Sequence, residues 1–244
     1  MSDEKSNEKT ENYPIIECRN LTKKFGEFTA VDNLNLTINR GEIFAFVGPN
    51  GAGKTTTMNM LVGLIEPTSG EAIIDGKSVI KDPIGVKKII GFLPENVSLY
   101  PTLTARQNVR YIANLNGINN EEKIDKVLEI VGLENVKDKK VGEFSKGMRQ
   151  RVGVACVLVK DPKVIFLDEP TSGLDPTGKI EFQGMLKKLK EDGITIFYSS
   201  HILGEVKGVA DRAGILHKGK LEKILNKNEI ENIEKFYKEI TGIA

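Results

Sequence analysis

Short apolar runs and stretches of helical periodicity alternate along the chain after a polar start. Residues 2–12 contain no apolar side chain, whereas the runs at 15–18, 30–38 and 43–47 are rich in Ile, Leu, Val and Phe. This pattern predicts an antiparallel edge that leads into one buried strand. The turn Asp75-Gly76 separates two further apolar pairs and predicts a short hairpin of the same antiparallel layer.

The middle third of the chain has helical spacing from Thr104 to about Asp161. Thr104 and Gln107 form a capping-box pattern that starts the first helix. A later helix is marked by an apolar stripe, and Gly132 stands where a glycine ends a helix. That stripe consists of Ile124, Val127, Leu128 and Val131. We therefore predict an inserted helical subdomain at about residues 97–160.

Strands that alternate with helices make up the rest of the pattern. Residues 164–167 and 194–198 are apolar runs typical of buried strands, and a helix begins at Asp175-Pro176 between them. Such alternation implies a parallel sheet with helices on both faces. At the C-terminus, one or two amphipathic helices are predicted, forming a short extension at 225–244. They are indicated by Ile224, Leu225, Ile230, Ile233 and Phe236.

Composition narrows the classes of function. The 244 residues include 35 Lys and Arg against 34 Asp and Glu, and this balance gives no electrostatic reason to expect a nucleic-acid partner. Cys18 and Cys156 have no Cys or His neighbours at metal-ligand spacing, so we expect two reduced thiols in a cytosolic protein. No run of 18 apolar residues is present, so we expect a soluble or peripheral protein. Residues 1–13 are expected to be a disordered tail rather than a signal peptide.

A glycine-rich loop between the buried strand at 43–47 and the following helix carries the first chemistry. Its spacing is G-x-x-x-x-G-K-[ST], in which backbone N–H groups and the helix N-terminus bind phosphate. Lys54 is expected to reach the β- and γ-phosphates, and the Thr55 hydroxyl to bind Mg²⁺. The alternative is a glycine-rich turn without a ligand, which the strand-loop-helix context disfavours. The predicted nucleotide-binding residues here are Gly48, Pro49, Asn50, Gly51, Ala52, Gly53, Lys54, Thr55 and Thr56.

An acidic pair stands at the carboxyl end of the strand at 164–167, where ligands of open α/β sheets collect. Asp168 is expected to hold Mg²⁺ through its water shell, and Glu169 to orient or deprotonate the attacking water. The alternative is a pair of solvated turn acids. The loop and the acidic pair predict a P-loop NTPase core. With the strand and helix patterns described above, the predicted fold is α/β: a P-loop NTPase core with a parallel sheet, an antiparallel β subdomain and an inserted α-helical subdomain.

From Ile15 to about Leu221 the sequence resembles the ATP-binding cassette (ABC) ATPases, the nucleotide-binding subunits of ABC transporters. The features that carry the resemblance occur in the family's order. They are Phe25, the phosphate loop, Glu95, Ser145 to Met148 at the start of a helix, Asp168-Glu169, Ser172 to Asp175, and His201.

The resemblance implies a role for each of these positions. Phe25 would stack on adenine, and Glu95 would contribute to the metal site with Thr55 and Asp168. Ser145 and Gly147 would bind the γ-phosphate held by the opposite subunit, with Asp175 also near nucleotide. His201 would act with Glu169 and Lys54 in catalysis.

Two positions depart from the usual family pattern. Glu95 stands where the family usually has Gln; its carboxylate can bind Mg²⁺ but cannot donate a hydrogen bond. The second motif has the sequence Phe-Ser-Lys-Gly-Met where Leu-Ser-Gly-Gly-Gln is commonest, so an amide is absent and Lys146 adds charge. These variants, with Leu99-Tyr100-Pro101 and residues 104–108, resemble the subgroup that energises exporters of drugs, sodium or polysaccharides.

The resemblance implies an ABC ATPase domain at 14–224 that binds ATP and Mg²⁺ and hydrolyses ATP. It further implies a homo- or heterodimer with another such subunit, an integral membrane permease as partner, and a location at the cytoplasmic face of the cell membrane. One alternative is a soluble ABC ATPase without a permease, and another is an ATP-binding regulatory module without turnover. A GTPase is disfavoured because residues 226–229 lack the Asp that would recognise guanine.

Overall fold

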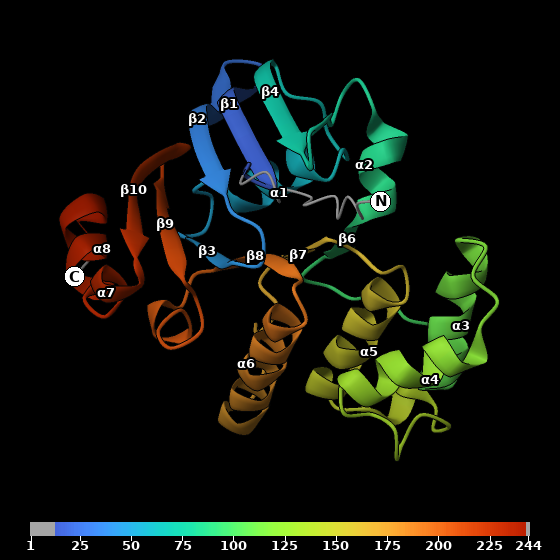
Figure 1. The fold of residues 1–244 in the computed structure, drawn as a ribbon. Coiled ribbons are helices and arrows are strands. Elements are labelled where there is room, and N and C mark those ends of the chain that lie inside the picture. Colours follow the sequence, from blue (N-terminus) through green and yellow to red (C-terminus); the bar gives the residue numbers. More distant parts are fainter. Residues whose placement is uncertain (1–12, 243–244) are drawn as a thin grey trace, which may run out of the picture.

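Two sheets organise the protein (Figure 1), for which a computed structural model describes residues 13–242. The first sheet is antiparallel and has the order β2-β1-β4-β5. Its strands are β1 (Ile16–Phe25), β2 (Phe28–Ile38), β4 (Ser69–Ile74) and β5 (Lys77–Ser78). The second sheet has the order β10-β9-β3-β8-β7-β6 and is parallel except for β10. Its strands are β3 (Ile43–Val47), β6 (Ile90–Leu93), β7 (Val164–Leu167), β8 (Thr195–Ser200), β9 (Arg212–His217) and β10 (Lys220–Asn226).

Helices and the antiparallel sheet cover the two faces of the parallel sheet (Figure 1). The helices are α1 (Lys54–Leu61), α2 (Pro83–Ile89), α3 (Ala105–Leu115), α4 (Glu121–Ile130), α5 (Lys146–Leu158), α6 (Pro176–Glu191), α7 (Lys227–Ile230) and α8 (Ile233–Thr241), with short 3-10 turns η1 (Val141–Glu143) and η2 (Leu203–Glu205). Every residue of β3, β7 and β8 is buried, as the continuous apolar runs predict for strands covered on both sides.

The side chains of β3 alternate between two cores because successive residues of a strand point to opposite faces. Ile43, Ala45 and Val47 belong to the core shared with the helical lobe and α6, whereas Phe44 and Phe46 face the core under the antiparallel sheet. In that second core, the Phe197 ring lies with its centroid 5.8 Å from that of Phe44, 5.4 Å from Phe46 and 5.6 Å from Phe166. This aromatic cluster joins the parallel sheet to the antiparallel layer.

The helical lobe of α3, α4 and α5 begins as its sequence predicts. Thr104 accepts from the Gln107 N–H at 3.1 Å and the Gln107 side chain accepts from the Thr104 N–H at 2.9 Å, so the predicted capping box is present. The apolar stripe of α4 is buried, and Gly132 follows the helix with φ of 70°. The region predicted as a helical insertion therefore forms a packed lobe beside the sheet (Figure 1); the domain boundaries themselves stay a prediction.

Several elements differ from the sequence-based expectation. The short helix α2 and the four-residue strand β6 were not predicted, because neither is long enough to display a periodicity. Ile224 and Leu225, expected in a C-terminal helix, lie in β10 opposite Gly214 and Ala213, and the helices begin only at Lys227. Pairing with β9 overrides the local pattern here. Of the predicted tail, residues 1–12 lie outside the described residues.

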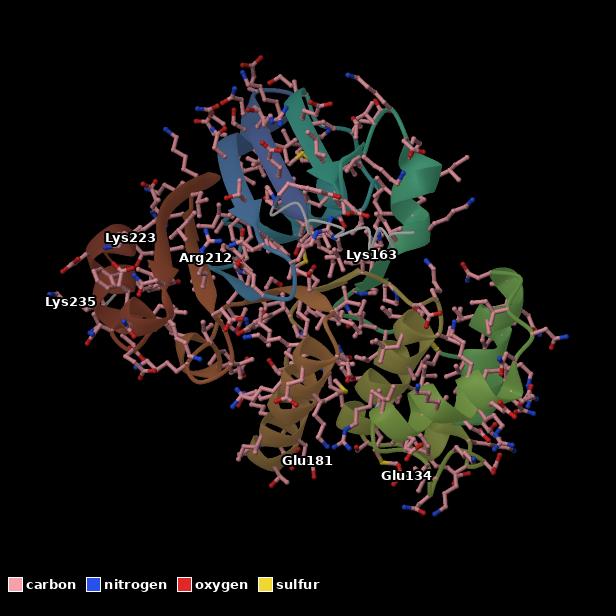
Figure 2. All side chains as sticks on the ribbon, viewed as in Figure 1. Glu134, Lys163, Glu181, Arg212, Lys223 and Lys235 are labelled. Carbon is pink, nitrogen blue, oxygen red and sulfur yellow. The ribbon has the colours of Figure 1, made fainter. Side chains whose placement is uncertain are left out.

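The side chains labelled in Figure 2 carry charges of both signs. Figure 2 shows Glu134 on the helical lobe, Glu181 on α6, Lys223 on the β10 side and Lys235 near the C-terminal helix. Across residues 13–242, no helix is long and apolar enough to cross a bilayer. Both cysteines are free thiols, and burial raises the pKa of Cys18 and of Cys156 to about 12.

We expect the aromatic cluster to contribute strongly to stability. Phe197→Ala should lower the free energy of unfolding by about 3–5 kcal/mol, since it removes a fully buried ring that contacts three others. Urea unfolding followed by circular dichroism measures this change. Ile180→Ala, at a side chain that is 69% exposed, is the control and should shift stability by less than about 0.5 kcal/mol. A loss below about 1 kcal/mol for the Phe197 variant would contradict the role given to the cluster.

Candidate functional site

The phosphate loop connects the end of β3 to the first residue of α1. Gly51 and Gly53 have φ of 78° and 106°, and Gly53 caps α1 without a side chain, which leaves the first amides of the helix free to bind an anion. The Lys54 ammonium folds back over the loop and donates to the carbonyl oxygens of Gly48 at 2.7 Å and Pro49 at 3.3 Å. The loop therefore presents backbone amides around a concave site, and the Lys54 ammonium lies across it.

Close packing, and not only backbone torsion, requires glycine in this loop. A Cβ on Gly48 would lie 2.3 Å from the carbonyl oxygen of Leu216, and one on Gly53 would lie 2.5 Å from that of Ala30. Leu216 is in β9 and Ala30 in β2. The loop is thus wedged between both sheets, so its amides have a fixed arrangement.

Asp168 connects the phosphate loop to the neighbouring strands. Parallel strands end at the same edge of a sheet, so the residues after β3, β7 and β8 meet there. The Asp168 Oδ2 accepts from the Thr55 hydroxyl at 2.8 Å, and its Oδ1 accepts from the Ser199 hydroxyl at 2.6 Å. The carboxylate is only 4% exposed. Two charge-assisted hydrogen bonds therefore fix the start of α1 against β7 and β8.

Glu169 lies beside two of the residues predicted to act with it. Its Oε2 is 2.8 Å from Nδ1 of His201 and accepts from the His201 N–H at 3.3 Å. Its Oε1 is 3.3 Å from the Lys54 ammonium. Glu169 has φ of 47°, a left-handed conformation that is costly for a residue with a side chain, and its N–H donates to the Ser199 hydroxyl at 2.9 Å. Strain of this kind persists only where neighbouring contacts enforce it, and it clusters at functional sites.

A cavity of about 250 Å³ opens over the phosphate loop. Phe28 lies on its wall and is 64% exposed, although the sequence pointed to Phe25. Phe25 is the register partner of Phe28, is half exposed, and has the Lys23 ammonium 5.1 Å from its ring centroid. Phe28 reaches the cavity wall because it pairs with Phe25 across the Gly26-Glu27 turn, a geometry that the chain order of the two residues does not reveal. The lining residues are Phe28, Ala30, Asn50, Gly51, Gly53, Lys54, Thr55, Thr56, Glu95 and Glu169.

The oxygen donors in this cavity suit a hard divalent cation. Thr55 and Glu95 line it and Asp168 contacts Thr55, while the Glu95 Oε1 accepts from the Ser172 hydroxyl at 3.3 Å. Within residues 13–242, no cluster of three or more His, Cys, Asp or Glu forms a metal site of its own. Mg²⁺ does not need such a cluster, because it keeps several waters and takes ligands from phosphates. The predicted metal-binding residues are therefore compatible with Mg²⁺ beside a bound nucleotide.

Seven of the predicted nucleotide-binding residues do not line this cavity: Phe25, Gly48, Pro49, Ala52, Ser145, Gly147 and Asp175. Gly48, Pro49 and Ala52 belong to the phosphate loop, and Phe25 pairs with Phe28, whereas the other three lie on different elements. Ser145 is the exposed N-cap of α5 and accepts from the Met148 N–H at 3.2 Å. Asp175 caps α6 in the same way, accepting from the Gly178 N–H at 3.2 Å. Neither they nor Gly147 line the cavity over the phosphate loop. One chain thus presents two separate groups of predicted nucleotide-binding residues.

A buried strand, a phosphate-binding loop, a helix and an acidic pair on the neighbouring strand define a P-loop nucleoside triphosphatase. Residues 31–172, more than half of the chain, match the family described as ABC transporter, and the protein belongs to that family. The chain is an ATP-binding subunit that hydrolyses ATP, and the predicted α/β fold is confirmed.

Named relatives and a solved structure support this assignment. The bacitracin transport ATP-binding protein BcrA of Bacillus licheniformis is 48% identical over 208 residues, 85% of this chain and 68% of BcrA. The lantibiotic transport ATP-binding protein SrtF of Streptococcus pyogenes is 39% identical over 225 residues, 91% of this chain and 96% of SrtF. The ATP-binding cassette MJ0796, solved as a dimer bound to ADP and Pi, is 31% identical with a TM-score of 0.76, over 87% of this chain and 98% of that one.

We expect Gly48→Ala to weaken ATP binding by about tenfold or more, because overpacking against the Leu216 carbonyl must displace the loop. Titration with a fluorescent ATP analogue measures the affinity. Gly184→Ala is the matched control, since a Cβ there meets no atom within 4 Å, and it should bind ATP like the unmodified chain. Unchanged affinity in a folded Gly48 variant would contradict the fixed arrangement of the loop.

Proposed function

We propose that two of these subunits, identical or paired with a related one, close head to tail on two Mg-ATP molecules and thereby drive export through a separate integral membrane subunit. The observation that carries the proposal is the separation of Ser145 from the phosphate loop. Ser145 and Gly147 begin a helix whose N-terminal amides suit phosphate, yet they do not line the cavity that holds Lys54. A second chain supplies the missing half of each site. The dimer of MJ0796 with ADP and Pi supports this arrangement.

Each residue of the cavity has a role in this proposal. Lys54 and the loop amides bind the phosphates, and Phe25 and Phe28 offer aromatic faces to the base. Glu169 accepts a proton from the attacking water or orients it, and His201 holds Glu169 in place through the 2.8 Å contact. Thr55, Asp168 and Glu95 hold Mg²⁺, which when bound neutralises charge that develops on the phosphates.

Binding of ATP can drive closure only because the closed state binds it more tightly than the open state. In the free chain, Lys54 pairs with Glu169 and with loop carbonyls. A phosphate must replace these partners. Contacts from Ser145 of the second chain are available only after closure, and they supply the difference in affinity between the two states.

An apolar groove on the helical lobe supports a membrane partner. It has a volume of about 350 Å³ and lies between the end of β6 and the helices α3 and α5. Tyr100 and Tyr111 stand at its rim, about half exposed, with ring centroids 5.0 Å apart. Exposed apolar grooves of this kind mark protein–protein contacts. The relatives named for bacitracin and lantibiotic transport support transport as the process. In this proposal the process is export, and the subunit lies at the cytoplasmic face of the cell membrane.

Glu169→Gln should lower the ATP hydrolysis rate by about 10²–10⁴-fold, because the amide cannot accept the proton of the attacking water. ATP binding should persist, and ATP should convert this variant from monomer to dimer. Phosphate release and size-exclusion chromatography with light scattering measure the two effects. Glu134→Gln, at an exposed position on the helical lobe, is the control and should hydrolyse ATP normally.

A second substitution tests the sharing of sites between chains. Ser145→Asp keeps a good N-cap for α5 but sets a carboxylate against the phosphate of the opposite chain. Added to the Glu169→Gln variant, it should leave ATP binding intact and prevent the dimer. Dimers that form equally well with Asp at this position, or full hydrolysis by a strict monomer, would contradict the proposed arrangement.

The membrane partner is tested by affinity purification of the tagged chain from detergent-solubilised membranes of its native cells. We expect a protein with several predicted transmembrane spans to copurify, and Tyr111→Glu to reduce its recovery by about tenfold or more. Leu115→Glu, on the same helix but outside the groove and 68% exposed, should not reduce it. Recovery of no multispan protein would instead favour the soluble ABC ATPase.

A further inference from the structure

A buried carboxylate, Glu205, lies outside the nucleotide cavity. Glu205 ends the short turn η2 and is 7% exposed. Its Oε2 accepts hydrogen bonds from the hydroxyl of Thr171 and, at 3.3 Å, from that of Ser200. Its Oε1 is 2.8 Å from the Lys179 ammonium. The partners come from three different segments: the loop after β7, the end of β8, and α6.

The position of these partners along the chain connects Glu205 to the site. Thr171 is two residues after Glu169, and Ser200 immediately precedes His201. Ser200 is itself fixed, since its hydroxyl accepts from the Ile202 N–H at 3.0 Å. Glu205 therefore holds both segments that carry the Glu169–His201 pair, although it does not line the nucleotide cavity.

The backbone at Glu169 needs such support. Its φ of 47° is unfavourable for a non-glycine residue and must be enforced from both sides. On one side, Ser199 accepts from the Glu169 N–H at 2.9 Å. On the other side, the Thr171 hydroxyl is anchored on Glu205. Within residues 13–242, the Thr171–Glu205 bond is the one side-chain hydrogen bond between the loop at 169–172 and the η2 turn.

Burial of a carboxylate is costly unless it is paired, so packing alone would favour an apolar residue here. The Glu205 backbone carbonyl also accepts from the Gln183 amide at 3.2 Å, which adds a second contact with α6. Hydrogen bonds at Oε2 and the ion pair at Oε1 together favour one geometry of the Glu205 side chain. The Tyr198 hydroxyl, buried nearby without a hydrogen-bond partner, has its pKa raised by burial and by the charge of Glu205.

We propose that Glu205 is a positioning residue for ATP hydrolysis: through Thr171 and Ser200 it sets the distance between Glu169 and His201. It acts on turnover and not on nucleotide affinity. The inference rests on the roles proposed for Glu169 and His201, and it is independent of the membrane partner.

Glu205→Ala should lower kcat for ATP hydrolysis by about 10–100-fold, because a displacement near 1 Å at the reacting groups costs that much. The ATP dissociation constant should stay within about twofold of that of the unmodified chain. Glu205→Gln keeps an oxygen that accepts from Thr171, so it should restore kcat to within about threefold. Thr171→Val alone should lower kcat, and in combination with Glu205→Ala it should cause little further loss, because the two residues act through one bond.

Val206→Ala distinguishes positioning from general loosening of the fold. Val206 is fully buried next to Glu205, so its truncation should lower the melting temperature while kcat per folded molecule is unchanged.

The inference is overturned if Glu205→Ala and Thr171→Val both keep full kcat, if ATP affinity falls as much as kcat, or if Val206→Ala reduces kcat equally. Should Glu205→Ala fail to fold, the Thr171 and Gln variants decide. Normal ATP hydrolysis by Glu169→Gln would reject the roles proposed for Glu169 and His201. If Glu169→Gln is inactive but the Glu205 variants keep normal kcat, only the positioning role of Glu205 is rejected.

Discussion

The two oxygens of the Asp168 carboxylate accept hydrogen bonds from hydroxyls of two different elements, Thr55 at the start of α1 and Ser199 in β8, and the Asp168 N–H donates to the Leu93 carbonyl at 2.9 Å. One residue thus connects the start of α1, β8 and the end of β6 to β7. Its burial makes these bonds obligatory, since an unpaired buried charge costs several kcal/mol. The phosphate loop, the strained turn at Glu169 and the position of His201 all depend on this junction. Because it lies at the carboxyl edge of a parallel sheet, the nucleotide site is part of the framework that holds the sheet together.

Sequence reasoning succeeded where local pattern and structure agree. The continuous apolar runs at β3, β7 and β8 predicted strands buried on both faces, and the capping box at Thr104 predicted the start of α3. The phosphate loop was predicted because backbone chemistry fixes its spacing, and the acidic pair because it follows a continuous apolar run.

Prediction from the sequence failed where tertiary contacts decide the structure. β10 forms because it can pair with the edge of β9, and β6 is too short to be distinguished from a loop. Phe28 enters the cavity through the geometry of a hairpin, which the chain order of Phe25 and Phe28 does not reveal. Glu205 has partners in three segments, and nothing in its immediate sequence marks it.

The residues predicted to bind nucleotide lie on two surfaces of a single chain. The cavity that contains Lys54 has the cation, the carboxylates and the aromatic wall, whereas the exposed N-termini of α5 and α6 carry Ser145 and Asp175. Both caps already use their side chains to satisfy amides of their own helices. The remaining amides of the first turn are the groups with unused donors, and they attract anions without any rearrangement of the fold. Division of this kind makes hydrolysis conditional on assembly in the proposed dimer, since neither surface alone surrounds a phosphate.

Charge pairing beside the phosphate loop compensates the buried ammonium of Lys54. Lys54 is 6% exposed and would be an uncompensated buried cation without an anion nearby. Glu169, 3.3 Å away, supplies that anion, and the carbonyls of Gly48 and Pro49 accept the remaining ammonium hydrogens. In the proposed mechanism, a phosphate takes the place of this carboxylate as the partner of Lys54. Glu169 then faces the attacking water as the proposed base, while His201 and the anchored loop keep it in place. The same carboxylate thus compensates the buried charge of Lys54 and, in the proposed mechanism, serves as the base.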